Sequence, residues 1–363
     1  MDLWIQLINS SFFTFIFSSM LTILLLVWLS KVGVKIGLVD YPGGRKKHKQ
    51  HVPLVGGLGI FGSISILFLP FAFTNKTYFW YWMASFILVC VCILDDKKTL
   101  SSKVRLLVQF GASLLVITIG DMRLSSLGNL WGHTPVLLGL LSIPFTSFSV
   151  IGITNAVNMM DGVDGLTAAV SSVEFLVLFL LAVHIGANQE ALLILAFLGA
   201  TSSFLLFNFP SQFTEKRKLF LGDSGSMLLG FTLSCMCIML TKMPNSYPPI
   251  LMVWIMALPI MDTLYLILNR KARGVSAFQA DRRHIHHILL LLHYTPRQTT
   301  LILTSTSCMI SAIGIILYFN DTPDDVLFYG FLMLLILYSM LVYGLKKHVI
   351  ARSISLFTPR HIF

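Results

Sequence analysis

The chain has few charged residues for its length. Of its 363 residues, 26 are Lys or Arg and 16 are Asp or Glu, whereas about 25% of a soluble domain is charged. Apolar residues make up 56% of the chain, so a water-facing surface cannot be built from it. The sequence therefore predicts a membrane protein and argues against a soluble enzyme. Despite the net charge of +10, we expect no nucleic-acid partner.

Other absences narrow the class further. The five cysteines form no C-x-x-C pair and are odd in number, so no disulfide framework is predicted. No G-x-x-x-x-G-K-[ST] motif is present, which argues against an ATP-driven pump. No internal repeat is visible, which weakly argues against transporters built from inverted repeats.

The apolar runs predict an all-α, polytopic fold with about eleven transmembrane helices, each of about 20 residues. The predicted spans are 7–30, 54–74, 78–94, 106–120, 135–153, 166–185, 190–207, 220–240, 248–268, 299–319 and 326–345. Little chain is left between them, so we expect residues 1–363 to form one transmembrane domain.

The basic residues predict the orientation of these spans. If the loop 31–53 is cytoplasmic, 23 of the 26 basic residues lie on the cytoplasmic side, and only Lys76, Arg123 and Lys242 lie outside. Such a bias is typical of inner-membrane proteins with basic cytoplasmic loops. It predicts a periplasmic N-terminus and a cytoplasmic C-terminus. The loops expected to carry the active site on that side are 31–53, 95–105, 154–165, 208–223 and 269–298.

Carboxylates are costly near a bilayer, and here they gather at the same predicted face. They include Asp40, Asp95, Asp96, Asp161, Asp164 and Asp223, with Asn155 and Asn158 in the same segment as two of them. Asp and Asn oxygens suit Mg²⁺, and Lys and Arg suit phosphate. The pattern predicts a site at headgroup level for a phosphorylated substrate and a divalent cation.

Simpler interpretations of these acids remain open. Asp95 and Asp96 could form a solvated helix end, and Asp164 and Asp223 could cap the helices that follow them. A calcium loop starting at Asp161 is disfavoured, because Val163 and Ser172 stand where an EF-hand needs acids. Two further acids, Glu174 and Asp262, fall inside predicted spans. We leave Glu174 unassigned, and we expect Asp262 to support the cytoplasmic site.

Two basic segments are candidates for anion binding. The later one contains Arg282, Arg283, His284, His286 and His287, whose donors suit phosphate or sugar hydroxyls better than zinc, because no Cys is near. The earlier one includes Arg45 and Lys46, for which anchoring to anionic lipid headgroups is an equal alternative.

Several of these segments, taken in order, resemble the motifs of one family. They are Asp40-x-Pro42 with Arg45-Lys46, Pro53-x-x-Gly56-Gly57, Asp95-Asp96, Asn155 to Gly165, Phe220-x-Gly222-Asp223, and His284-Ile-His286-His287. Together they resemble the polyprenyl-phosphate N-acetylhexosamine-1-phosphate transferases. The histidine segment and the length are similar to the GlcNAc-1-phosphate branch that initiates O-antigen and enterobacterial common antigen synthesis.

The resemblance implies an eleven-helix enzyme of the bacterial inner membrane with a cytoplasmic active site. It would transfer GlcNAc-1-phosphate from UDP-GlcNAc to undecaprenyl phosphate, release UMP, use Mg²⁺ or Mn²⁺, and feed lipopolysaccharide synthesis. Its partners would be the two substrates and the lipid bilayer, and a homodimer is open. The same chemistry feeding teichoic acid, another UDP-sugar, and the phospho-MurNAc-pentapeptide transferases are alternatives, as is a secondary transporter.

The resemblance also implies residue roles. Asp223 and Asn158 resemble the metal site, and Asp95, Asp96, Asp161 and Asp164 resemble the essential acids. The implied substrate-binding residues are Phe220 for uracil, Arg105 for the lipid phosphate, and Asp40, Arg45, Lys46, Asn155, Arg282, Arg283, His284, His286 and His287. We expect direct attack by the lipid phosphate, with Asp95 assisting as a base and Asp96 positioning it. Double displacement through a phosphoaspartate is the competing mechanism.

Overall fold

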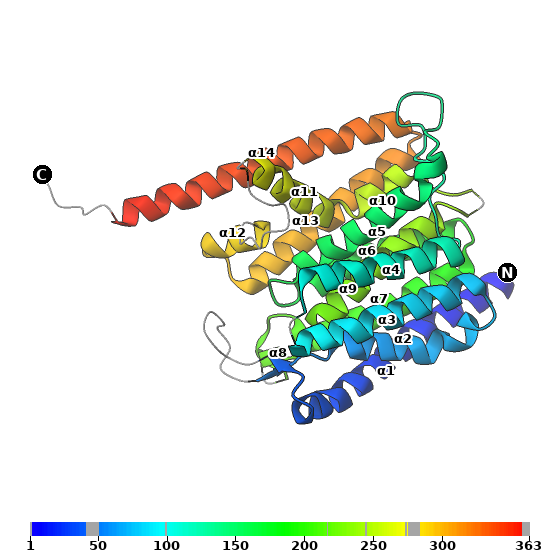
Figure 1. Ribbon diagram of the computed structural model, residues 1–363, viewed down its shortest axis with the longest axis horizontal. Coiled ribbons are helices and arrows are strands. Elements are labelled where there is room, and N and C mark those ends of the chain that lie inside the picture. Colours follow the sequence, from blue (N-terminus) through cyan, green and yellow to red (C-terminus); the bar gives the residue numbers. More distant parts are fainter. Residues whose placement is uncertain are drawn as a thin grey trace, which may run out of the picture.

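The computed structural model describes residues 2–40, 51–98, 100–215, 217–243, 245–272, 274 and 284–357. Helices run side by side through one bundle, which Figure 1 shows from one side. The elements are α1 Asp2–Lys35, β1 Val39–Asp40, β2 Val52–Pro53, α2 Gly56–Ala72, α3 Lys76–Lys98, α4 Ser102–Leu114, a π-helical turn Leu115–Ile119, a 3₁₀ turn Gly139–Leu141, α5 Ser142–Met159, α6 Leu166–His184, α7 Asn188–Asn208, α8 Gln212–Glu215, α9 Gly222–Leu240, α10 Pro249–Ile255, α11 Ala257–Ala272, α12 Ile285–Leu291, α13 Pro296–Phe319 and α14 Asp324–Phe357.

The all-α, polytopic membrane fold is confirmed. Within the described ranges, nine helices are long and apolar enough to cross a membrane. A helix or a helix pair stands at each of the eleven predicted spans. However, α2 has only 17 residues, and the span 248–268 is a bent pair. The number eleven and the orientation therefore stay predictions.

The span predicted at 248–268 is not one continuous helix. The chain bends by 85° between α10 and α11, and Pro259 in the first turn of α11 supplies the cause. A proline cannot donate to the carbonyl four residues before it, here that of Ile255, and its ring collides with that carbonyl in a straight helix. The Ser311 hydroxyl of α13 donates to the Ile255 oxygen at 3.2 Å instead, so this carbonyl has a partner at the bend.

Helix α9 lies in the middle of the bundle, packed against α2, α3, α5 and α6. Nearly all its side chains are buried, so it has almost no contact with lipid. Small residues allow this packing: a Cβ added to Gly57 in α2 would lie only 2.6 Å from the Gly225 Cα atom. The backbones of α2 and α9 therefore touch, and the position of the α9 N-terminus is fixed by its neighbours.

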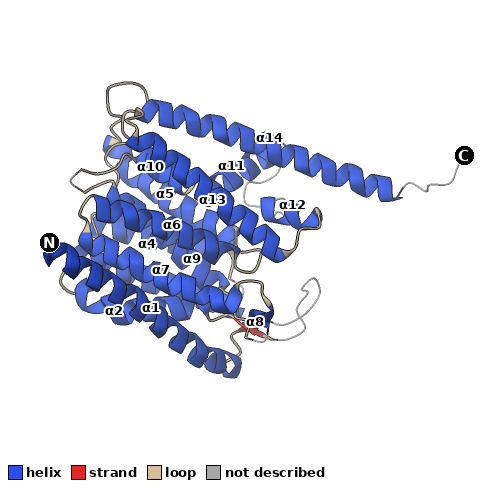
Figure 2. Cartoon of the chain, turned by 180° about the vertical axis from the view of Figure 1, so that it is seen from behind, coloured by secondary structure: helices blue, strands red, loops and turns tan. Residues whose placement is uncertain are grey.

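One end of the bundle carries the short elements, and we call it the site end; α3 ends there and α9 begins there. The strands β1 and β2 pair antiparallel, and Figures 1 and 2 place them with α8 at this end, where α12 also lies. The Phe220 N–H donates to the Pro53 carbonyl at 2.9 Å, and the Gly56 N–H donates to the Phe220 carbonyl at 3.0 Å. These bonds join the Pro53-x-x-Gly56-Gly57 segment to the segment that leads into Asp223.

Candidate active site

Asp96, in the last turn of α3, holds the N-terminus of α9. Its two carboxylate oxygens accept hydrogen bonds from the backbone N–H groups of Asp223, at 3.0 Å, and Ser224, at 3.4 Å. A carboxylate at a helix N-terminus satisfies donors that the helix itself cannot. Gly222 makes room for it, since its φ is +73° and an added Cβ would lie 2.7 Å from an Asp96 oxygen. The acid pair is therefore not a solvated helix end.

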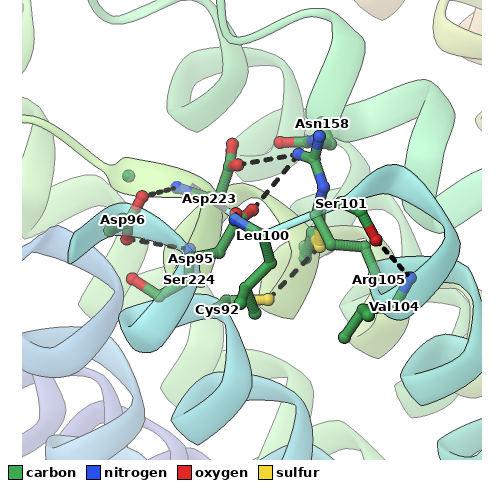
Figure 3. Close-up of polar contacts among 12 residues, drawn as sticks. Cys92, Asp95, Asp96, Leu100, Ser101, Val104, Arg105, Asn158, Asp223 and Ser224 are labelled. Atoms are coloured by element: carbon green, nitrogen blue, oxygen red, sulfur yellow. Dashed lines mark hydrogen bonds and ion pairs between the residues drawn. The ribbon is translucent and has the colours of Figure 1, made fainter. Parts of the chain in front are cut away.

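Arg105 joins Asp95 to Asp223 (Figure 3). Its Nη1 atom lies 3.2 Å from Asp95 Oδ2 and 3.1 Å from Asp223 Oδ2. The Ser101 side chain caps α4 by accepting from the Val104 N–H, which places Arg105 in the first turn of α4, facing the acids. Asp95 is almost fully buried, whereas Asp223 is 34% exposed. Asp223 is thus the more accessible of the two carboxylates.

The predicted loop 154–165 is helical over its first part, because α5 continues to Met159 and includes Asn155 and Asn158. The Asn158 Oδ1 atom accepts from the Ser226 hydroxyl of α9 at 2.5 Å. The Asn155 Nδ2 atom donates to Gln109 Oε1 of α4 at 2.6 Å. The two amides therefore lock α5 to the two helices that carry Asp223 and Arg105.

Asp161 and Asp164 follow α5 but have different surroundings. The Asp161 side chain stays accessible to water, yet desolvation by the surrounding protein, and next repulsion from Asp223, raise its pKa above the ordinary value. The Asp164 carboxylate instead pairs with Lys218 Nζ at 2.6 Å. It does not cap α6, whose N-terminus begins after Gly165 without a side-chain cap.

Phe220 is held by its backbone. Its N–H and carbonyl bond to Pro53 and Gly56, as described above, and the ring is partly buried. Lys218 Nζ lies 5.0 Å from the ring centroid, a cation–π distance. Asp164, Lys218 and Phe220 thus form a short series of contacts at the site end.

The three histidines lie together at the start of α12. The His284 Nδ1 atom lies 2.7 Å from Asp262 Oδ2 of α11, so Asp262 does support this segment. His286 is 1% exposed, and burial, followed by the nearby His287, lowers its pKa to about 3. The His286 ring is therefore neutral near pH 7. Its Nε2 atom faces Gly162 so closely that a side chain at that position would collide with it.

Some predicted residues cannot be placed. Arg45, Lys46, Arg282 and Arg283 lie outside the described residues. Asp40 is described, at the end of β1 and partly buried. The roles assigned to these five residues stay predictions.

Among the described residues, acids outnumber bases at the site. Asp161 interacts electrostatically with Asp223 and Asp96, and Arg105 is the cation paired with Asp95 and Asp223. In the described part of the chain, no three His, Cys, Asp or Glu side chains are grouped closely enough to hold a metal ion. However, Mg²⁺ typically takes one or two carboxylates and completes its shell with water and substrate phosphates. Asp223 and Asn158 fit that kind of site, because their donors are oxygens.

The sequence reasoning missed four residues of this region. Each contacts a residue named from the sequence: Gln109 contacts Asn155, and Lys218 contacts Asp164. Ser226 contacts Asn158, and Tyr338 contacts Asp262. Gln109 had a visible signal, since it is an amide inside an apolar run of α4. Ser226 and Tyr338 had none, because a hydroxyl in a membrane helix usually bonds within its own helix or packs against lipid.

Comparison with known proteins places these segments in context. Residues 78–241 match the profile of glycosyl transferase family 4, a range that contains the acid pair, Arg105, the asparagines and Asp223. Over 320 residues, the chain is 32% identical to the undecaprenyl-phosphate α-N-acetylglucosaminyl 1-phosphate transferase of Escherichia coli K12, covering 87% of each chain.

Two further relatives have similar coverage. The Yersinia pestis protein of the same name is 34% identical over 337 residues, which cover 91% of this chain and 90% of that one. A probable undecaprenyl-phosphate N-acetylglucosaminyl 1-phosphate transferase of Bacillus subtilis is 30% identical over 302 residues, covering 82% and 83%. The likeness therefore extends over most of the chain.

Proposed function

The chain belongs to glycosyl transferase family 4, and from this we infer that it transfers GlcNAc-1-phosphate from UDP-GlcNAc to undecaprenyl phosphate, releasing UMP. One observation carries the inference: the Asp95-Asp96 segment and the Asp223 segment, far apart in sequence, meet at Arg105. Relatives named for this reaction match over most of the chain. A site of acids and an arginine at one end of a helical bundle also suits two anionic substrates better than a transport path through the middle.

The residues divide between the two substrates. Arg105 would bind the lipid phosphate, since a guanidinium suits phosphate oxygens, and Asp95 fixes its orientation. Phe220 would stack on the uracil, and the histidine segment would contact the diphosphate and the sugar. Asn155 orients α5 beside them through Gln109.

A divalent cation, Mg²⁺ with Mn²⁺ as the alternative, would be held by Asp223 and Asn158. When bound, it would neutralise the charge on the diphosphate oxygens. Asp96 keeps the Asp223 backbone in place, as its hydrogen bonds to the start of α9 indicate. The roles of Asp161 and Asp164 would differ accordingly: Asp161 would act beside Asp223, and Asp164 orients Lys218 near the Phe220 ring.

We propose direct displacement. A phosphate oxygen of the lipid attacks the β-phosphorus of UDP-GlcNAc, the P–O bond to UMP breaks, and UMP leaves with the bonding electrons. The lipid phosphate has a second pKa of about 6 and is largely dianionic already, so it needs little help from a base. Asp95 remains our candidate for what assistance exists, although the Leu100 N–H and Arg105 already engage its oxygens.

The competing double displacement is separable by experiment. Purified protein is incubated with UDP-GlcNAc labelled in the sugar phosphate, without lipid. Direct displacement predicts no label on the protein and no exchange of UMP into UDP-GlcNAc. Label trapped on an aspartate, or UMP exchange without lipid, would exclude it.

A UMP-release assay tests the proposed function as a whole. Purified protein, Mg²⁺ and undecaprenyl phosphate are supplied with a panel of UDP-sugars, including UDP-GlcNAc, UDP-GalNAc and UDP-MurNAc-pentapeptide. We expect release with UDP-GlcNAc above all others. In the cell, we propose that the reaction takes place at the cytoplasmic face of the inner membrane. If none of the UDP-sugars gave UMP release, the enzyme proposal would be overturned. UMP release mainly with UDP-MurNAc-pentapeptide would move the chain to another branch of the superfamily.

The pathway that uses the product is a finer proposal. We propose that it initiates O-antigen and enterobacterial common antigen synthesis, with teichoic acid as the alternative. Deletion of the gene in its host, followed by analysis of surface polysaccharides, distinguishes them: loss of O-antigen without loss of teichoic acid is the expected result.

A further inference from the structure

Asp262 is buried, and three hydrogen bonds tie it to two other segments. It is 2% exposed. Its Oδ2 atom pairs with His284 Nδ1 at 2.7 Å, and its Oδ1 atom accepts from the Ile285 N–H at 3.1 Å and from the Tyr338 hydroxyl at 2.8 Å. The side chain therefore connects α11 to the histidine segment and to α14.

These contacts determine how the histidine segment is presented. Because Asp262 takes the Nδ1 atom of His284, Nε2 is the nitrogen left to meet a ligand. The bond to the Ile285 N–H satisfies a free donor at the start of α12 and fixes the backbone there. Tyr338 is a second donor to the Oδ1 atom, and both oxygens of this buried carboxylate have partners, a condition for burying it at all.

The orientation of His284 extends to its neighbours. The rings of His284 and His286 stack with centroids 5.4 Å apart and an interplanar angle of 12°. His286 in turn packs against Gly162, the residue that follows Asp161. A rotation of His284 would thus disturb His286 and the segment that carries Asp161.

We propose that Asp262 and Tyr338 are positioning residues that set the His284 ring for the diphosphate-sugar donor, a role that rests on the function proposed above. Both are buried, so they act through His284. Tyr338 belongs to α14, a helix that otherwise contacts the bundle mainly at α10 to α13. The last helix thereby becomes part of the donor site, although it carries no residue of the recognised motifs.

The test compares Tyr338→Phe with Tyr343→Phe, which removes an exposed hydroxyl from the same helix. For Tyr338→Phe we expect the KM for UDP-GlcNAc to rise about threefold to tenfold, the effect of one buried hydrogen bond. The KM for undecaprenyl phosphate should not change, and Tyr343→Phe should match the unaltered protein for both. Asp262→Asn should raise the donor KM further, because it weakens the bond to His284.

A double-mutant cycle separates positioning from simple stabilisation. If Tyr338 acts through His284, adding Tyr338→Phe to His284→Gln should raise the KM for UDP-GlcNAc little beyond the value for His284→Gln alone. The proposal would be overturned if the effects of the two substitutions on the donor KM were additive. It would also be overturned if Tyr338→Phe changed the KM values for both substrates equally, or left the KM for UDP-GlcNAc unchanged.

A second readout is independent of turnover. In protein with ¹⁵N-labelled histidines, signals assigned with His284→Gln should show Nδ1 protonated in the unaltered chain and a mixed tautomer in Asp262→Asn. The same tautomer in both would overturn the proposal. An unaltered protein that releases no UMP with any sugar would instead refute the proposed function, and the tautomer result would still decide whether Asp262 orients His284.

Discussion

At the scale of single residues, Asp223 combines accessibility with a fixed backbone. Asp96 holds its N–H, Gly222 allows the turn before it, and Arg105 contacts one of its carboxylate oxygens. Asp95 also has a carboxylate side chain, but it is almost completely buried. The two acids are thus unequal, and Asp223 is the one suited to a cation that also touches substrate.

Asp223→Asn should remove Mg²⁺-dependent turnover while the protein still folds. The amide keeps the size of the side chain but loses its charge, and we expect at least about a hundredfold lower kcat, comparable to the loss of one electrostatic group in an active site. UMP release is measured across a Mg²⁺ series. Asp321→Asn, at the opposite end of the bundle, is the matched control and should be silent. Full activity of Asp223→Asn at ordinary Mg²⁺ would show that the cation is held elsewhere.

His286 gives a prediction about pH and stability. Burial lowers its pKa in the folded protein from 6.5 to about 3, so the unfolded chain binds a proton below pH 6.5 that the folded protein refuses. Acid therefore favours unfolding. The free energy of unfolding falls further as the pH decreases from 6.5 towards 3. His286→Gln should unfold at a temperature that depends less on pH between 7 and 5. Thermal unfolding is measured on detergent-solubilised protein, and His348→Gln, at an exposed position, is the control. If the unfolding temperature changed equally with pH in the unaltered protein and in both variants, the lowered pKa of His286 would be contradicted.

At the scale of elements, the contact between α2 and α9 positions the site. Gly57 and Gly225 let the two backbones touch, and the hydrogen bonds from Gly56 and Gly57 to the Phe220 and Leu221 carbonyls secure the chain that enters α9. Both glycine segments were visible as motifs. Their physical reason, a close approach between helices that begin at the same end, was visible only in the fold.

Gly57→Ala should destabilise the protein and lower its activity. The added methyl group would meet the Gly225 backbone, which cannot rotate away, and overpacking of this kind costs about 1–3 kcal/mol. Thermal unfolding and UMP release are measured together. The matched control is Gly111→Ala in α4, where no atom lies within 4 Å of the added Cβ and alanine favours the helix. A Gly57→Ala protein as stable as Gly111→Ala would contradict the close contact.

The same scale shows what the sequence could and could not predict. Continuous apolar runs located the helices, and the ends of those runs placed Asp95 and Asp223 at one face. The bend at Pro259 was readable in principle, because a proline inside a span weakens the helix before it. The pairing of Asp262 with Tyr338, 76 residues away, left no trace in spacing, since it depends on how α11 and α14 cross.

At the scale of the whole molecule, charge is scarce and unevenly distributed. Most basic residues belong to the segments that join helices at the site end, while Lys76, Arg123 and Lys242 belong to those at the other. Glu174 is an exception inside the bundle: it is fully buried, and neither carboxylate oxygen has a hydrogen-bond partner within the described residues. Glu174 belongs to the middle of α6 rather than to either end, so it leaves the uneven distribution of charge between the two ends unchanged.

That distribution predicts the orientation of the chain in the membrane. Basic segments are retained on the cytoplasmic side, so reporters fused after Arg217 and after Lys347 should be cytoplasmic, and those fused after Arg123 and Asn245 should be periplasmic. Alkaline phosphatase, active only outside, and green fluorescent protein, fluorescent only inside, are fused at each position and should give opposite signals. Replacing Lys97, Lys98 and Lys103 with glutamine removes three positive charges from one loop and spares Arg105. The difference between cytoplasmic and periplasmic reporter signals should become smaller, but the orientation of the chain should not invert. A periplasmic reporter after Arg217 would place Asp223 away from cytoplasmic UDP-sugars and would refute both the orientation and the proposed reaction.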